Sequence, residues 1–150
     1  MRILGILQNA WARDPARVEQ IIEMEKRRLS EPDFYAWRRA FTSRLMFAGR
    51  GKTAQRLGKF GFEAIEFEEA SPKVGGRSAS NFGFDRDHLV KVFTHYQPEV
   101  VVAFGKVTLE GVRSIGVLPC ACQIIESPHP AARAADTEQK LKLISVTLQL

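Results

Sequence analysis

The stretch EVVVAFG (residues 99–105) decides the fold, because it holds five consecutive apolar residues, three of them valine. Pro98 ends the segment before it, and Gly105 closes it. A short unbroken apolar run rich in β-branched residues is typical of a strand buried on both faces of a parallel sheet. We therefore predict a central strand here. Val102→Asp should unfold the domain, since an unpaired buried charge is prohibitive.

Segments with strand and helix patterns alternate on either side of this run. The predicted strands are 2–7, 62–69, 99–105 and 117–126, and the predicted helices are 15–29, 34–45, 53–62, 86–97, 106–116 and 136–150. Asp14, Asp85 and Asp136 are expected N-caps, the last with Gln139 three residues on, and Gly61 is an expected left-handed cap. The alternation predicts one domain over residues 1–150, a three-layer α/β/α sandwich with a central four-stranded parallel sheet.

The connection ASPKVGGRSASNFGFD (residues 70–85) does not fit either pattern. Its sixteen residues are rich in Gly, Ser and Pro. Ordinary connections are much shorter, so we expect a functional or mobile loop.

The charge of the chain favours an acidic partner. The net charge is +5 and the pI about 9.5. Basic residues are concentrated in one third of the chain, where aromatic residues lie among them. They indicate either a surface for a phosphate backbone or the solvated face of two helices. These basic residues are Arg27, Arg28, Arg38, Arg39, Arg44, Arg50, Lys52 and Arg56.

The cysteine count and the apolar runs bear on the compartment. Cys120 and Cys122 lie in the predicted strand 117–126, and we interpret them as small apolar residues, since a disulfide so close in sequence would be strained. No run approaches the ~20 apolar residues of a membrane helix, and the N-terminus lacks a cleavage site. We expect a cytoplasmic protein without a membrane partner or a metal.

Polar residues follow the predicted strands, where ligands of parallel sheets bind. Gln8 and Asn9 follow the first strand, Ser71 the second, Lys106 the third and His129 the fourth. Two prolines bracket His129 and would hold its imidazole at a fixed angle. The sequence therefore predicts a site at one edge of the sheet.

Four stretches resemble the uracil-DNA glycosylase superfamily. LGILQNAWA lies where its first motif belongs and SPHPAAR where its His-Pro turn belongs. LMFAGRGKTAQRLGKFGF is similar to its Phe-x-Gly segment, and QPEVVVAFGKVTLEGV to its third strand and Gly-Lys turn. The resemblance spans nearly the whole chain. It implies a monomeric glycosylase that hydrolyses the N-glycosidic bond of uracil or another deaminated or damaged base in single- or double-stranded DNA.

The resemblance implies roles for individual residues. Asn9 would hold a water against the sugar carbon, and His129 would donate a hydrogen bond to the base oxygen. Phe47 would stack on the flipped base, and Arg133 would fill the vacated space or grip a phosphate. Some relatives bind an iron–sulfur cluster through four cysteines, but this chain has two, so no cofactor is expected.

Further contacts follow from the same resemblance. Trp11 would narrow or roof the pocket, and Gln8 would touch the substrate. The family often reads the base edge with an asparagine beyond its second strand, where this chain offers Ser71 and, further along, Asn81. The expected DNA contacts are Arg50, Lys52 and Lys106 together with Arg133.

Other interpretations of these residues stay open. Asn9 could bond its own backbone at a strand end, His129 could be a satisfied turn histidine, Phe47 could belong to the core and Arg133 to the surface. GRGKT (residues 49–53) invites a phosphate-loop hypothesis, although Met46 replaces its first glycine. The alternative function is a nucleic-acid-binding protein of the same fold without catalysis.

Overall fold

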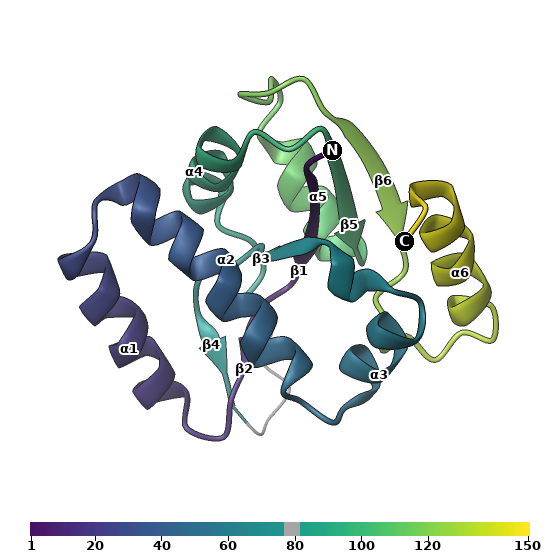
Figure 1. The fold of residues 1–150 in the computed structure, drawn as a ribbon, viewed down its shortest axis with the longest axis horizontal. Coiled ribbons are helices and arrows are strands. Elements are labelled where there is room, and N and C mark those ends of the chain that lie inside the picture. The colour runs from purple at the N-terminus through teal and green to yellow at the C-terminus, as the bar shows by residue number, and fades with distance from the viewer. Residues whose placement is uncertain (77–81) are drawn as a thin grey trace.

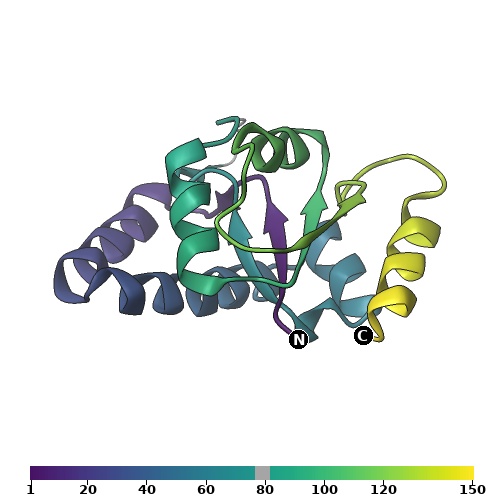
Figure 2. The same cartoon turned by 90° about the horizontal axis from the view of Figure 1, so that it is seen from above.

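A central parallel sheet organises the computed structural model, which describes residues 1–76 and 82–150. Its strands are β1 (Ile3–Leu7), β3 (Glu66–Glu69), β5 (Val100–Phe104) and β6 (Gln123–Ser127), in the order β3-β1-β5-β6. All neighbouring strands pair in parallel, and β5 lies between β1 and β6, as predicted. Figures 1 and 2 show the strands pointing the same way between layers of helices.

Helices cover both faces of the sheet, which confirms the predicted α/β/α sandwich. Residues of α3 (Lys52–Lys59) and α6 (Thr137–Leu148) pack on one face. Residues of α4 (Arg86–Tyr96) and α5 (Lys106–Ser114) pack on the other. The long α2 (Glu31–Phe47) lies along the edge strand β3, and α1 (Pro15–Arg28) lies outside α2 (Figure 1).

Alternation along the inner strands distributes the core between the two faces. In β1, Ile3 and Leu7 join the cluster under α3 and α6, whereas Leu4 and Ile6 join the cluster under α4 and α5. Gly5 lies between them, and a Cβ there would come within 2.6 Å of the Phe67 ring. The strand therefore needs glycine at this position to admit the aromatic packing.

Several predicted boundaries are wrong. Residues 62–69 are not one strand, because a 3-10 turn, η1 (Phe62–Ala64), precedes β3. The last strand begins at Gln123 rather than 117, so Cys120 and Cys122 precede it; both are free thiols. Apolar content alone suggested a longer strand, but only residues from Gln123 onward pair with β5.

A second, two-stranded sheet was missed. It pairs β2 (Ala10–Trp11) with β4 (Val74–Gly75) in parallel. The first part of the loop predicted over residues 70–85 is thus ordered, because its backbone continues the hydrogen bonding of β3 to the chain beyond β1. The Ala70 and Ser71 amides donate to the carbonyls of Leu7 and Gln8.

The predicted helix caps are mostly confirmed. The Asp14 and Asp85 carboxylates accept hydrogen bonds from the amides of Arg17 and His88. Gly61 is left-handed, with φ of 79°. Asp136 makes no side-chain cap, because its carboxylate pairs with Lys140 instead.

The basic surface expected from the arginine-rich third of the chain is smaller than predicted. Arg38 and Arg39 of α2 are buried against the carboxylates of β3. Arg38 donates through Nε to Glu68 Oε1 and through Nη2 to Glu69 Oε2, both at 3.0 Å. Arg38 neutralises the buried carboxylates of Glu68 and Glu69, whereas Arg39 pairs with the exposed Glu66 at 3.5 Å. Neither buried guanidinium is available to a phosphate backbone. No helix among the described residues has the length and apolar character to cross a membrane.

Candidate functional site

A cavity of about 460 Å³ opens at the carboxyl ends of the strands. It is bounded by the end of β1, by β2, by the end of β3, by the junction of α2 and α3, and by the turn after β6. Its size lies within the ~300–1,000 Å³ of small-molecule sites. The lining includes Gln8, Asn9, Trp11, Arg50 and His129, five of the residues predicted from the sequence.

Asn9 is half-buried where β1 gives way to β2. Its Nδ2 donates to the carbonyl oxygen of Ala10 at 3.0 Å. This bond fixes the amide group, as expected for an asparagine that ends a strand. Oδ1 has no hydrogen-bond partner among the described residues, so an acceptor is left for a ligand or a water.

His129 sits in the turn after β6, and its tautomer follows from one hydrogen bond. The Ala131 amide donates to Nδ1 at 3.0 Å, so Nδ1 carries no proton. A neutral imidazole then holds its proton on Nε2. Burial lowers the pKa of His129, which favours this neutral form. The ring is thus a neutral donor through Nε2.

Two segments that are distant in sequence lie against the turn that carries His129, and one of them, α3, holds it through hydrogen bonds. Gly105 has φ of 96°, and a Cβ there would lie 3.4 Å from the His129 Cβ. Arg56 of α3 donates through Nη1 to the carbonyl oxygens of Pro130 and Ala132, at 2.9 and 2.7 Å. From its place among the basic residues of its segment, Arg56 was expected at the surface, so this clamp was missed.

Glu69 lines the same cavity and was also missed. It ends β3, opposite Leu7 of β1, and is 5% exposed. Burial, opposed by Arg38, raises its pKa to about 7. A signal for it did exist: side chains alternate along a strand, so two adjacent glutamates cannot both face solvent.

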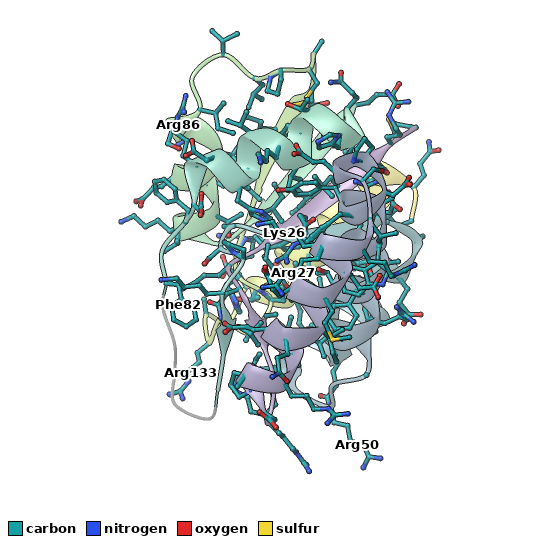
Figure 3. The ribbon with its side chains drawn as sticks, turned by 90° about the vertical axis from the view of Figure 1, so that its left-hand side faces the viewer. Lys26, Arg27, Arg50, Phe82, Arg86 and Arg133 are labelled. Atoms are coloured by element: carbon teal, nitrogen blue, oxygen red, sulfur yellow. The ribbon has the colours of Figure 1, made fainter. Side chains whose placement is uncertain are left out.

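The rim of the cavity carries an exposed aromatic and a positive charge. Trp11 is 54% exposed in β2, and Arg50 is exposed at the start of the α3 segment. In Figure 3, Arg50 and Arg133 both project toward the lower end of the molecule, whereas Lys26 and Arg27 lie on α1 near the middle. Lys52 and Lys106 are exposed at the first positions of α3 and α5.

Two predicted substrate contacts, Phe47 and Ser71, do not line the cavity. The Phe47 ring packs edge-to-face on Phe67 at 5.8 Å, so it belongs to the core and the predicted stacking role is corrected. Ser71 is buried, and its Oγ accepts from the Lys73 amide, which makes it a turn residue. Asn81 lies outside the described residues.

The phosphate-loop hypothesis for GRGKT is wrong. Such a loop follows a strand, but here residues 49–53 follow α2. The segment instead forms one wall of the cavity through Gly49, Arg50, Gly51 and Thr53.

A larger cavity, of about 620 Å³, lies among α1, α2, α4 and the chain after β3. Acidic and basic side chains alternate around it, including Glu23, Lys26, Glu31 and Lys91. Its floor contains His88, whose Nε2 donates to the Glu69 carbonyl oxygen at 3.0 Å. Burial lowers the pKa of His88 to about 3, so the ring is neutral.

Two observations concern metals and relatives. Among residues 1–76 and 82–150, no group of three or more His, Cys, Asp or Glu side chains is placed to hold a metal ion.

No known protein family matches the chain, and no curated protein is significantly similar to it. The function must therefore be argued from the cavity.

Proposed function

We propose that this protein is a DNA glycosylase that hydrolyses the N-glycosidic bond of uracil or of another deaminated or damaged base. The observation that carries the proposal is the shared cavity. Among the residues that the structure describes, the Asn9 amide oxygen and the His129 Nε2–H have no hydrogen-bond partner, and both side chains line a space that suits a nucleobase.

The two groups suit the two charges that develop as the bond breaks. The departing base gains negative charge, and the His129 Nε2–H is a fixed donor for its oxygen; one such donor supplies ~3–4 kcal/mol in other enzymes. The sugar carbon gains positive charge and needs a water nearby. Asn9 Oδ1 can hold that water, since its own amide group is fixed by Ala10.

The rim suits a base that has left the duplex. Extruding a base costs a few kcal/mol, and an exposed aromatic such as Trp11 offers a stacking surface worth ~1–3 kcal/mol. Arg50, Lys52, Lys106 and Arg133 are exposed and would contact phosphates. We place the protein in the cytoplasm, because its cysteines are free thiols. A monomer suffices, because one chain supplies the cavity.

The test is base excision followed by alkali. Short single- and double-stranded oligonucleotides that contain uracil, hypoxanthine or a mismatch are incubated with wild type, Asn9→Ala and His129→Ala. We expect alkali-labile product from wild type and a loss of about 10²–10³ in rate for His129→Ala. His95→Ala is the matched control, because that imidazole pairs with Glu31 away from the cavity. Equal activity of all variants would refute the proposal.

A second function rests on the state of the Asn9 amide. The Asn9 amide already bonds the backbone of Ala10, and an amide is not a base. Both facts favour a nucleic-acid-binding protein that has the fold without the chemistry. It would bind in a salt-sensitive way, form no abasic product, and be indifferent to Asn9→Ala and His129→Ala.

A further inference from the structure

The cavity holds one carboxyl group that the chemistry described above does not use. We propose that Glu69 is the general base of the reaction, the group that takes a proton from the attacking water. This inference rests on the proposed glycosylase function. It adds a residue from β3, one strand away from the amide of Asn9.

The contacts of Glu69 hold it in place and leave one oxygen available. Oε2 accepts from Arg38 Nη2 at 3.0 Å. The backbone carbonyl of Glu69 accepts from His88 Nε2, which fixes the strand end. Oε1 makes no hydrogen bond to any described residue, and it is not among the buried unsatisfied atoms. Since Glu69 lines the cavity, Oε1 is the oxygen that a bound water can reach.

The reaction needs such a group because Asn9 cannot accept a proton. The water oxygen bonds to the anomeric carbon, and the bond from that carbon to the base nitrogen breaks. The electron pair leaves with the base, whose oxygen accepts a hydrogen bond from His129. The proton released by the water goes to the Glu69 carboxylate. Asn9 then orients the water and Glu69 receives its proton, so two residues share the activation of the water.

Five charged or titratable groups face Glu69. Arg38 comes from α2, Glu68 from the same strand, and His88 from α4, while Arg50 and His129 share the cavity. Burial raises the pKa of Glu69 to about 7, with Arg38 opposing the rise and Glu68 adding to it. A base with a pKa near the working pH is well suited to this role. His88 and His129 are neutral and add no charge.

Glu68→Gln is the matched control for Glu69→Gln. Both glutamates pair with Arg38, but only Glu69 lines the cavity. On an oligonucleotide that wild type cleaves, we expect Glu69→Gln to lower the excision rate by about 10²–10⁴. Glu68→Gln should stay within a few-fold, and its rate should still rise with pH. The inflection should lie below that of wild type, because the charge of Glu68 no longer raises the pKa of Glu69. Melting curves establish that both variants are folded.

A binding measurement tests the same role without turnover. The probes are two duplexes, one with a cationic pyrrolidine and one with a neutral tetrahydrofuran in place of the target sugar. Wild type should prefer the pyrrolidine duplex, and the preference should grow as pH rises through 7. Glu69→Gln should lose both the preference and its pH dependence, whereas Glu68→Gln keeps them.

The outcomes separate the two proposals. Should wild type excise a base and Glu69→Gln match it in rate and pH profile, or keep the pyrrolidine preference, the role of Glu69 is overturned and the glycosylase stands. Should wild type excise no base from any of the oligonucleotides, the glycosylase proposal itself falls, and Glu69 falls with it.

Discussion

The cavity among the helices is larger than the cavity at the strand ends, about 620 against 460 Å³, yet the smaller one carries the candidate site. Around the larger cavity, exposed acids and bases balance one another. Lys91 and His95, for example, both pair with Glu31. Around the smaller cavity, a few polar side chains are fixed by hydrogen bonds to the backbone and still have a donor or acceptor atom available for a ligand. Unsatisfied, oriented groups mark a site better than volume does.

The two cavities share a wall. Arg38 lines the larger cavity and bonds Glu69, which lines the smaller one. His88, on the larger side, bonds the Glu69 backbone. The charged groups of this wall are structural on one side and available for chemistry on the other. Variants of each side should therefore differ in what they damage.

Replacing Arg38, the cation in the wall between the two cavities, should have the largest effect on stability. Arg38→Met leaves Glu68 and Glu69 buried without their cation, and breaking such a pair costs ~3–5 kcal/mol. The loss should be smaller at pH 5, where both carboxyls, whose pKa values are raised, take up protons. Urea denaturation at pH 7 and pH 5 measures this. Arg27→Met, at an exposed pair, is the control and should change stability by less than about 0.5 kcal/mol.

The two histidines should separate chemistry from stability. His129→Ala should lower excision by about 10²–10³ with little change in melting temperature, because the ring is a donor to substrate. His88→Ala should cost ~1–3 kcal/mol of stability, because it leaves the buried Glu69 carbonyl without its partner. If activity instead falls in proportion to stability in both variants, the contrast between the cavities is lost.

The stability of Glu69→Gln relative to wild type should depend on pH. Glu69 titrates at about 7 in the folded state and near 4.5 when unfolded, so folding favours its protonated form. That contribution is full below pH 4.5 and is lost as pH rises through 7. As pH rises from 4.5 to 7, the free energy of unfolding of the variant should therefore increase relative to that of wild type, by a few kcal/mol at most. The contribution of His88 to stability has the opposite pH dependence, because it is lost as pH falls from 6.5 toward 3. Since wild type and variant share His88, this contribution cancels in the difference between them. Thermal melts from pH 4 to 8.5 that show a constant difference would contradict the assignment.

The smallest contrast concerns exposed cations. Arg50→Ala, at the rim of the smaller cavity, should weaken duplex binding and reduce the slope of log affinity against log salt by about one. Lys26→Ala, at the larger cavity, should change neither. Fluorescence anisotropy at several salt concentrations compares them. Equal losses would mean that binding uses general charge rather than a defined rim.

Local patterns account for what the sequence could predict. The apolar run of β5, the caps at Asp14 and Asp85, and the place of His129 after a strand all depend on neighbours within a few residues. They sufficed for the sandwich and for bringing Asn9 and His129 to one cavity. The β2–β4 pair was out of reach, because two-residue strands carry no periodicity.

The missed parts of the site depend on distant partners. Glu69 is held by Arg38, thirty-one positions away, and the turn of His129 by Arg56, more than seventy positions away. A glutamate is predicted to be exposed unless the cation that pairs with it is known. An arginine on a helix is likewise predicted to lie on the surface unless the carbonyl groups that accept its hydrogen bonds are known. Phe47 was assigned to a base from the resemblance of its segment, and its core partner Phe67, in another element, was not predicted.

The ends of the chain have a practical consequence. Figure 2 shows both termini at the amino ends of the strands, and Leu150 packs there against Gly61. The cavity opens at the opposite, carboxyl ends of the strands. An affinity tag or a fluorophore joined to either end would therefore sit on the far side of the molecule from the cavity at the strand ends. Protein that is immobilised through either end can be presented with the opening of the cavity facing solution, which suits surface-based kinetic measurements.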